Sequence, residues 1–321
     1  MRRPATLLAA ALLLLGAAPA AHAFDLQGHR GARGLAPENT MAAFERALAI
    51  GVTTLETDLA LTRDGVLVLS HDPTLNPDLT RGPDGAWLAG PGPAIRSLSL
   101  DELRRYDVGR LKPGTRYATQ WPRQLPADGA RIPTLAELIE RVRGLTVGLN
   151  IETKLTPDRP GETADPETFA SAVADAVLKS GMAERILVQS FDWRTLVALK
   201  RIAPGIATSC LTIETDRWNT VADVGAAPSR WTAGLSLNAA GGSVPRLVAM
   251  AGCRVWSPFW RNVDAARMGE ARAAGLKVVP WTINEPADMA ALVALGVDGL
   301  ITDVPDVARE TLARLGVKID N

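Results

Sequence analysis

Two histidines in this chain are placed where they could move protons. His29 directly follows an apolar, strand-like stretch and His71 ends another, whereas the third histidine, His22, lies in an N-terminal segment that we expect to be removed. Histidine can accept or donate a proton near neutral pH, so a pair can divide the base and acid roles of one reaction. A lone histidine is more often structural, and the value of this pair therefore depends on what lies beside it.

Three carboxylates, Glu56, Asp58 and Glu152, occupy other strand-like stretches near their ends. Residues i and i+2 of a strand share a face, so Glu56 and Asp58 point the same way. Charges inside a small barrel are unfavourable unless they are paired, and a hard divalent cation, Ca²⁺ or Mg²⁺, prefers such oxygen ligands. The alternative for each residue alone is a surface or salt-bridged carboxylate, for instance Glu152 with Lys154. Their joint position favours a metal site.

Fixed positive charge accompanies these groups. Arg30 directly follows His29, and Lys154 shares a strand face with Glu152 and Asn150. Guanidinium and ammonium groups suit a phosphate oxygen, both in the ground state and as charge develops during reaction. Histidines, carboxylates and cations together indicate metal-dependent cleavage of a phosphate ester.

The elements that must position these residues alternate along the chain. Short apolar strands alternate with amphipathic helices, which predicts a parallel (β/α)₈ TIM barrel, with a doubly wound open sheet as the main structural rival. The predicted strands are 25–28, 53–58, 145–154, 186–190, 206–212, 253–257, 276–281 and 299–303. The predicted helices are 39–51, 135–143, 167–180, 193–201, 263–274 and 286–295, the first of them with Asn39-Thr40 as N-cap pair and Gly51 as C-terminal stop.

Two segments interrupt this alternation. Asp64-Gly65 is a strong hairpin turn, so the second strand is expected to run past the barrel mouth and fold back to deliver His71. Residues 73–133 are rich in Pro and Gly and too long for a simple loop. They are expected to form an ordered insertion that caps the barrel mouth, with Trp87 and Trp121 among the side chains available for burial; the alternative is a disordered linker.

The N-terminus predicts export. Arg2 and Arg3 precede an apolar Ala/Leu run that ends in Ala21-His22-Ala23, typical of a signal peptide cut after Ala23. The alternative is an amphipathic or buried first helix. The remaining domain, residues 24–321, would be periplasmic or secreted, without stable membrane insertion. An oxidising compartment permits a disulfide between Cys210 and Cys253, although two small buried apolar side chains are an equal alternative.

The charge balance bears on the class of partner. Lys and Arg number 35 and Asp and Glu also number 35. A protein that binds nucleic acid needs a basic surface, so this balance favours a small-molecule substrate and argues against a nucleic-acid partner.

Several ordered motifs resemble one enzyme family. The block "GHRGARGLAPENTMAAFERALAIGVTTLETDLALTRDGVLVLSHD" is similar to the opening of the glycerophosphodiester phosphodiesterase family, with its His-Arg-Gly start, Pro-Glu-Asn-Thr turn, Glu-x-Asp pair and His-Asp end. The resemblance continues, in the family's order, through "LNIETK", "VQSFDW", "VVPWTIN" and "GVDGLITDVP". It spans nearly the whole mature chain, and the long segment before "RIPTLAELI" resembles the insertion of the exported, periplasmic branch. Many motifs in order are far more specific than one short pattern.

The resemblance implies a TIM barrel, a divalent metal and a set of residue roles. Glu56, Asp58 and Glu152 would be the metal ligands, and His29 and His71 the general acid and base. The substrate would be bound by three further residues, Arg30 and Lys154 at the phosphate and Trp281 beside the glycerol. The insertion and residues 215–251 match the family least well.

The expected reaction is hydrolysis of a glycerophosphodiester to sn-glycerol 3-phosphate and a free alcohol. The attacking hydroxyl group would come from water or from the glycerol 2-position, the second route passing through a cyclic phosphate. Two competing functions rank lower. A phospholipase D-like activity on lysophospholipids or sphingolipids would need an apolar groove and membrane contact. A non-catalytic exported binding protein would have lost a histidine or a carboxylate, and the sequence retains them all.

Overall fold

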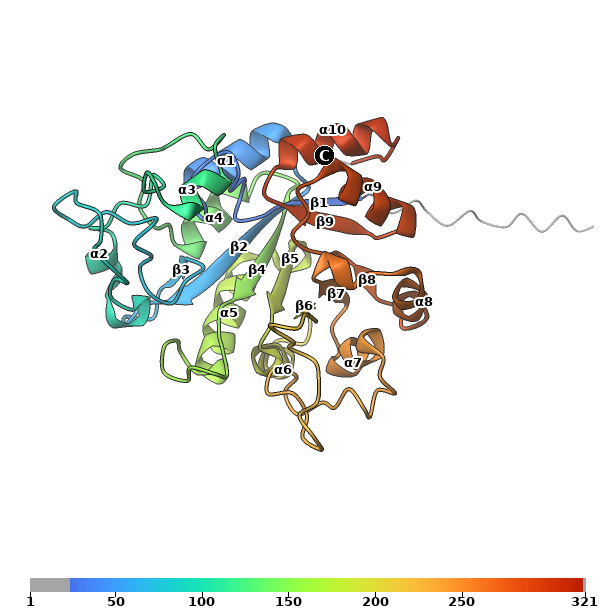
Figure 1. Cartoon of the computed structure of the whole chain (residues 1–321). Helices are drawn as coiled ribbons and strands as arrows, with labels where there is room; N and C mark the ends of the chain where they lie inside the picture. Colours follow the sequence, from blue (N-terminus) through green and yellow to red (C-terminus); the bar gives the residue numbers. More distant parts are fainter. Residues whose placement is uncertain (1–23, 320–321) are drawn as a thin grey trace, which may run out of the picture.

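Eight parallel strands form the centre of the molecule. The computed structural model describes residues 24–319. The strands are β1 (Asp25–Gly28), β2 (Thr54–Leu61), β3 (Leu67–Leu69), β4 (Gly148–Thr153), β5 (Ile186–Ser190), β6 (Ala207–Thr212), β7 (Val255–Pro258), β8 (Lys277–Val278) and β9 (Gly299–Thr302). The parallel strands pair in the order β8-β7-β6-β5-β4-β2-β1-β9, and β3 pairs with β2 alone (Figure 1). Apart from β3, strands that are neighbours in the ring are neighbours in sequence, and the first strand, β1, pairs with the last, β9.

Backbone hydrogen bonds join the two ends of this sheet. The Asp298 N–H donates to the Val278 carbonyl at 2.9 Å, and the Ile301 N–H donates to the Pro280 carbonyl at 3.0 Å. The segment after β8 thus lies against β9 and completes the ring. Sequential strands that close on themselves make a TIM barrel, whereas a doubly wound sheet reverses its order and stays open. The predicted barrel is confirmed and its rival is excluded.

Helices cover the outside of the ring, except for two short ones that lie within residues 73–133 (Figure 1). They are α1 (Met41–Ile50), α2 (Leu100–Leu103), α3 (Arg116–Gln120), α4 (Leu135–Val142), α5 (Pro166–Ser180), α6 (Trp193–Ile202), α7 (Val244–Ala251), α8 (Ala265–Ala273), α9 (Pro286–Leu295) and α10 (Pro305–Arg314), with short 3₁₀ turns at Ile95–Ser97, Ala183–Arg185 and Trp260–Asn262. In α1, Thr40 is the N-cap and Gly51 closes the helix in the left-handed region, with φ of 87°. The apolar core lies between these helices and the strands and includes the fully buried Trp193 and Trp256.

Most predicted elements have observed counterparts. The bounds of β1, β5 and α9 match the prediction, and the remaining predicted strands and helices are found with shifted ends. Helices α7 and α10, and the short α2 and α3 within residues 73–133, were not predicted. The predicted strand 276–281 is assigned only at Lys277–Val278, and its later residues make single backbone hydrogen bonds to the β7 and β9 segments on either side.

The hairpin after β2 forms as expected. Strand β2 runs to Leu61, and β3 returns antiparallel with Leu69 opposite Leu59. Gly65 adopts φ of 79° in the turn, a conformation that glycine takes without strain. The returning arm delivers His71 just beyond the end of β3, beside the carboxyl end of β2.

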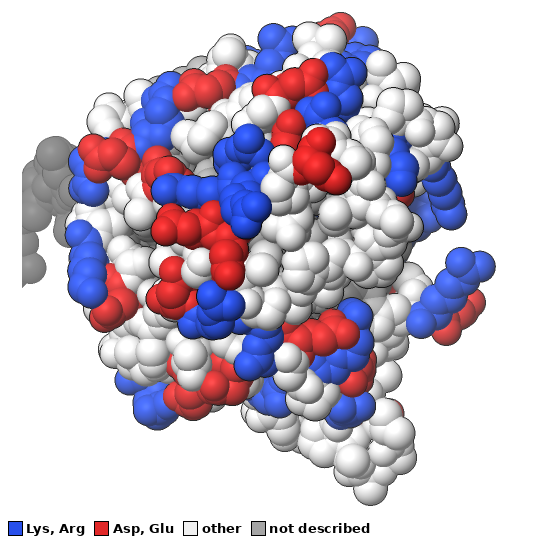
Figure 2. All heavy atoms as spheres, turned by 90° about the vertical axis from the view of Figure 1, so that its left-hand side faces the viewer, with Lys and Arg blue, Asp and Glu red and all other residues white. Residues whose placement is uncertain are grey.

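Residues 73–133 are folded over one side of the barrel mouth, at the left of Figure 1. They share an apolar cluster with the hairpin, which we call the cap cluster; it comprises Ala60, Val68, Leu75, Ile95, Leu103 and Ile132. The cap also contacts the barrel. The Tyr117 hydroxyl donates to the Glu38 carboxylate, and the Arg33 guanidinium lies 4.9 Å from the ring centre of Trp121. Acidic and basic side chains are interspersed on the molecular face that bears the cap (Figure 2).

A disulfide joins two adjacent strands of the barrel. Cys210 in β6 is bonded to Cys253, just before β7, with their Cα atoms 5.9 Å apart. The Arg254 N–H donates to the Thr208 carbonyl at 2.9 Å, so the backbones beside the disulfide are already paired. The pairing that the sequence left open is therefore present. Within residues 24–319, no helix has both the length and the apolar character needed to cross a bilayer. The predicted signal peptide, residues 1–23, lies outside the described residues.

Candidate active site

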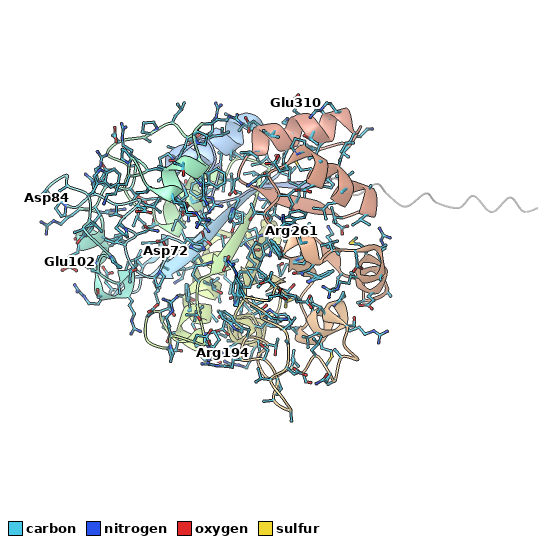
Figure 3. The ribbon with its side chains drawn as sticks, in the orientation of Figure 1. Asp72, Asp84, Glu102, Arg194, Arg261 and Glu310 are labelled. Atoms are coloured by element: carbon cyan, nitrogen blue, oxygen red, sulfur yellow. A yellow bond between two sulfur atoms is a disulfide. The ribbon has the colours of Figure 1, made fainter. Side chains whose placement is uncertain are left out.

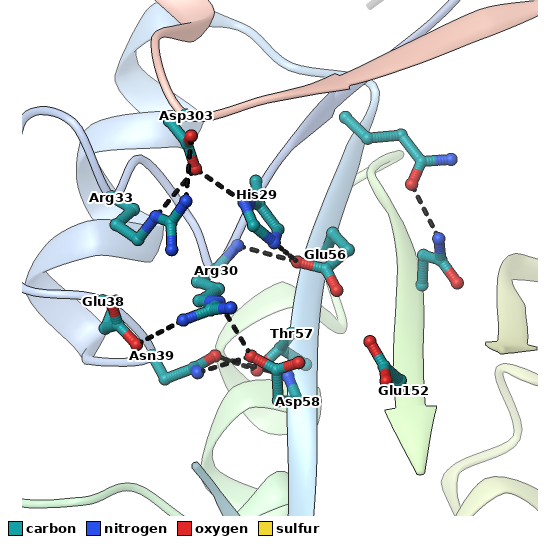
Figure 4. Close-up of polar contacts among 12 residues, drawn as sticks. His29, Arg30, Arg33, Glu38, Asn39, Glu56, Thr57, Asp58, Glu152 and Asp303 are labelled. Carbon is teal, nitrogen blue, oxygen red and sulfur yellow. Dashed lines mark hydrogen bonds and ion pairs between the residues drawn. The ribbon is translucent and has the colours of Figure 1, made fainter. Parts of the chain in front are cut away.

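Three buried carboxylates meet at the carboxyl ends of two neighbouring strands. Glu56 and Asp58 come from β2 and Glu152 from β4, and the strand register sets Asp58 opposite Glu152. One oxygen of each carboxylate lies within 4.8 Å of the others, and all three side chains are buried (Figure 4). The period of two along β2 and the register of β4 thus bring together the predicted metal ligands.

Three buried carboxylates so close together are costly to ionise unless positive charge lies beside them. Burial, followed by the neighbouring Asp58, raises the pKa of Glu56 well above its usual range. Burial also raises the pKa of Glu152 to about 7, against the lowering effect of Lys154. Burial opposes ionisation of Asp58 as well, but Arg30 and Lys154 hold its pKa well below the usual range. Glu56 and Glu152 are therefore more easily protonated than ordinary carboxylates, and a further cation among them would favour their ionised forms.

The donor set fits a hard divalent cation. The Asp58 Oδ1 atom is buried without a hydrogen-bond partner, and its nearest charge is the Lys154 ammonium at 3.6 Å. Carboxylate oxygens are the ligands that Ca²⁺ and Mg²⁺ prefer. The salt bridge considered as the simpler alternative is also present, since the Lys154 Nζ atom lies 2.8 Å from the Glu152 Oε1 atom. This ion pair leaves the three carboxylates close together, so the salt bridge and a metal site are compatible.

His29 is held against the carboxylates by an acid that the sequence reading did not single out. Its Nδ1 atom lies 2.6 Å from the Asp303 Oδ1 atom, and its Nε2 atom faces the Glu56 Oε2 atom at 3.9 Å. Asp303, directly after β9, also accepts hydrogen bonds from Arg33 at 2.8 and 3.0 Å. Burial lowers the pKa of His29, partly opposed by Asp303. The second nitrogen is thereby left to face the pocket.

His71 is held in a similar way from the opposite side. Its Nδ1 atom lies 2.8 Å from the Asp72 Oδ1 atom, and Asn76 donates to Asp72 at 2.7 Å. Asp72 lies near the strand ends, whereas the cap residues Asp84 and Glu102 lie at the molecule's edge (Figure 3). Burial, together with Arg30 and Lys154, lowers the pKa of His71 to about 4. The imidazole is therefore neutral at neutral pH.

The predicted phosphate-binding cations border the same cluster. The Arg30 guanidinium donates to Glu38 at 2.6 Å and lies 3.1 Å from an oxygen of Asp58, while its backbone N–H donates to Glu56 at 2.8 Å. Arg30 adopts φ of 51°, which turns its backbone toward Glu56. These contacts fix the guanidinium at the pocket, and the Lys154 ammonium is held there by Glu152 and Asp58.

A cavity of about 190 Å³ opens among these groups. Its lining includes His29, His71, Glu56, Glu152, Arg30, Arg33, Lys154, Gln189, Phe191 and Trp281. The predicted site residues therefore share one pocket, except Asp58, which lies behind its wall in contact with Arg30 and Lys154. Trp281 forms an apolar side, with its indole N–H donating to the Ser257 carbonyl at 3.0 Å.

Several supporting residues escaped the sequence reading. Gln189 donates to the Glu56 Oε1 atom at 3.0 Å, and Asn39 donates to the Asp58 Oδ2 atom at 2.9 Å. Arg33 and Asp303, which are 270 residues apart in the sequence, form an ion pair. Two of these residues could have been found from the sequence. Asp303 ends a predicted strand, where active-site residues of a barrel lie, and Asn39 belongs to the Pro-Glu-Asn-Thr turn. The partners of Asp303, His29 and Arg33, reach it only because β1 and β9 are adjacent.

The family comparison gives a match over most of the chain. The model of the Glycerophosphoryl diester phosphodiesterase family matches residues 29–307. A glycerophosphodiester phosphodiesterase from Caldanaerobacter subterraneus subsp. tengcongensis is 29% identical over 282 residues, which cover 87% of this chain and 93% of that protein.

Solved structures have the same fold. One from Silicibacter pomeroyi DSS-3, assigned to the glycerophosphoryl diester phosphodiesterases, is 32% identical with a TM-score of 0.82, covering 94% of this chain and 96% of that one. An Oleispira antarctica phosphodiesterase, solved in complex with the product sn-glycerol-3-phosphate, is 25% identical with a TM-score of 0.65, covering 91% of this chain and 97% of that one.

Proposed function

Because this chain belongs to the glycerophosphoryl diester phosphodiesterase family and is a phosphoric diester hydrolase, we propose that it hydrolyses glycerophosphodiesters to sn-glycerol 3-phosphate and an alcohol. The observation that carries the proposal is one pocket that joins two histidines, two carboxylates and three cationic side chains. The third carboxylate, Asp58, completes the acidic cluster behind the wall. The Oleispira antarctica relative was solved with the product sn-glycerol-3-phosphate, which supports glycerol 3-phosphate as one of the two products here.

The proposed cofactor is one divalent cation, Ca²⁺ or Mg²⁺. Glu56, Asp58 and Glu152 would hold it, since they offer carboxylate oxygens within 4.8 Å of one another. When bound there, such an ion neutralises phosphate charge and lowers the pKa of the attacking hydroxyl group. Arg30 and Lys154 contribute fixed charge for the phosphate oxygens, and Trp281 offers an apolar surface for the glycerol carbons.

The two histidines would carry the proton transfers. Each has its Nδ1 atom against a carboxylate, His29 against Asp303 and His71 against Asp72, so each has Nε2 available for chemistry. One histidine takes the proton of the attacking hydroxyl group, which belongs to water or to the glycerol 2-position. The other enters the reaction as the imidazolium, which its carboxylate and the bound phosphate anion stabilise, and gives its Nε2 proton to the departing alkoxide as the alkoxide's bond to phosphorus breaks. In the second route the histidines exchange roles when water opens the cyclic phosphate.

The proposed location is the periplasm or the cell exterior. The basic start, apolar run and Ala21-His22-Ala23 pattern are typical of a cleavable signal peptide. The disulfide between Cys210 and Cys253 supports the proposal, because such bonds persist mainly in oxidising compartments. Expression of the full chain, followed by fractionation and N-terminal sequencing, tests it; a mature protein beginning elsewhere than Phe24, or retained in the cytoplasm, contradicts it.

The test of the activity is release of glycerol 3-phosphate from several glycerophosphodiesters, before and after EDTA. We expect release that EDTA abolishes and that excess Mg²⁺ or Ca²⁺ restores. A control with EDTA already saturated by metal separates chelation from nonspecific inhibition. Binding of the diesters without EDTA-sensitive release would instead indicate a non-catalytic binding protein.

A further inference from the structure

A row of aromatic side chains leads from the pocket toward the surface. Phe191, just after β5, and Trp281 both line the pocket, with ring centres 5.2 Å apart and planes at 89°. Trp218 lies 4.8 Å from Phe191, and Trp231 lies 5.7 Å from Trp218 at an angle of 70°. We call Phe191, Trp218 and Trp231 the aromatic corner. It extends the apolar wall of the pocket beyond the catalytic groups proposed above.

The corner lies where substrates of this fold bind. Trp218 and Trp231 belong to the long loop between β6 and α7, yellow to orange in Figure 1. Loops that follow the carboxyl ends of barrel strands line the active-site mouth. The sequence of this loop resembles the family least, so a group recognised here would be a property of this chain.

The loop holds Trp218 in place before any ligand arrives. The backbone of Thr215 donates to the Trp218 carbonyl at 2.9 Å, while the Trp218 N–H donates to the Thr215 hydroxyl at 3.1 Å. A bridge between Glu214 and Asn219 closes the same turn. Ordering the indole therefore costs little at the moment of binding.

Packing within the protein covers Phe191 and Trp231 more completely than it covers Trp218. Phe191 and Trp231 pack with Leu211 and Ile213 in a small apolar cluster, whereas Trp218 remains 38% exposed. Within residues 24–319 the arginines that stack on indoles do so at Trp87, Trp121 and Trp260. The corner therefore offers aromatic faces that no arginine of the described chain occupies.

We propose that the aromatic corner binds the quaternary ammonium group of choline in glycerophosphocholine. The inference rests on the proposed function, because the phosphate must first be held at Arg30 and Lys154. A trimethylated ammonium cannot donate hydrogen bonds, and aromatic faces are the environment that attracts it. A primary ammonium needs hydrogen-bond acceptors instead, which the faces of aromatic rings do not provide.

The decisive comparison changes only the charge of the headgroup. The wild-type enzyme, loaded with metal, is given glycerophosphocholine and the neutral isostere in which a tert-butyl group replaces trimethylammonium. Desolvated cation–π contacts predict a kcat/KM about 5- to 30-fold higher for the choline ester. Glycerophosphoethanolamine, measured alongside, is expected to fall below the choline ester. Because this comparison needs no variant, it stands even if a substitution prevents folding.

Two variants locate the effect. Trp218→Leu is expected to bring the ratio of choline ester to isostere close to one. Trp87→Leu, a matched change in the cap where Arg81 stacks on the ring, is expected to leave the ratio unchanged. An unchanged ratio in Trp218→Leu overturns the assignment of the corner.

The remaining outcomes are also distinct. Equal or faster hydrolysis of the isostere by the wild-type enzyme overturns the proposal. It would indicate that the aromatic corner binds an apolar group, such as an acyl chain. Hydrolysis of all diesters without a choline preference refutes only the headgroup inference. Absence of glycerol 3-phosphate release from every diester refutes the proposed function and, with it, this inference.

Discussion

The substitution Asp303→Asn tests whether His29 depends on its buried carboxylate. Asp303 Oδ1 accepts from His29 and from the Arg33 Nε atom, while Oδ2 accepts from the Arg33 Nη2 atom and from Asn284 at 2.7 Å. Asparagine keeps the shape and one acceptor. It removes the charge and turns an N–H₂ group toward two donors. His29 then keeps a neutral hydrogen bond in place of a charge-assisted one.

The size of the effect follows from that exchange. A hydrogen bond to a charged partner exceeds a neutral one by about 1–2 kcal/mol, which corresponds to a loss of about 5- to 30-fold in kcat/KM. The unmatched donors of Arg33 and Asn284 should also lower the free energy of unfolding by about 1–3 kcal/mol. Asp303 acts here as a positioning residue, through His29, and does not itself contact the substrate in the proposed scheme.

The assay needs readouts that separate orientation from stability. Kinetics with glycerophosphocholine give kcat/KM, denaturation gives stability, and ¹H–¹⁵N NMR of the imidazoles reports the strength of the His29 Nδ1–H hydrogen bond. A matched control is Asp192→Asn, since Asp192 is fully buried and pairs with Arg194 at the start of α6, outside the pocket lining. The control should lose stability and keep its turnover.

The reasoning is wrong if Asp303→Asn keeps kcat/KM within about twofold of wild type, below the range expected for a charged hydrogen bond. It is equally wrong if turnover falls while the imidazole signals show no weakening of the His29 Nδ1–H hydrogen bond, because the loss would then reflect general destabilisation.

Two further predictions concern a hydrogen bond to a proposed metal ligand and the disulfide between β6 and β7. Gln189→Leu removes the hydrogen-bond donor to Glu56 Oε1. Because loss of a residue that orients a metal ligand weakens metal binding, the affinity for Mg²⁺ or Ca²⁺ should fall about 10- to 100-fold, as measured by titration calorimetry. An unchanged affinity would show that Glu56 does not depend on this hydrogen bond. Replacing Cys210 and Cys253 together by Ala opens a loop of sequence separation 43, and it should lower the free energy of unfolding by about 4 kcal/mol in denaturant titrations. An equal midpoint for wild type and variant would contradict a stabilising disulfide.

The sequence was sufficient for the features that depend on local pattern. Alternation of apolar runs predicted the barrel, and Asp64-Gly65 predicted the hairpin that delivers His71. The carboxylates Glu56 and Asp58 could be placed on one face because strands repeat every two residues. Glu152 joins them through the register of β4 against β2, which the order of the strands made plausible.

Features that depend on distant contacts were not predictable in this way. Arg33 and Asp303 meet because closure of the barrel sets β1 beside β9. The disulfide likewise requires β6 beside β7. Helix α7 follows the glycine-rich end of a long loop whose composition hides its start, although Ser243 caps it in the usual way. The aromatic corner depends on how that loop folds back over Phe191, which no periodicity reveals.

The most direct test of the account is glycerol 3-phosphate release by His29→Ala and His71→Ala beside wild type, with metal present and folding checked by circular dichroism. Both histidines line one pocket with the acidic cluster, so each substitution should abolish turnover while the spectrum and metal binding remain. Near-normal kcat in either folded variant would contradict the claim that this pair carries the proton transfers.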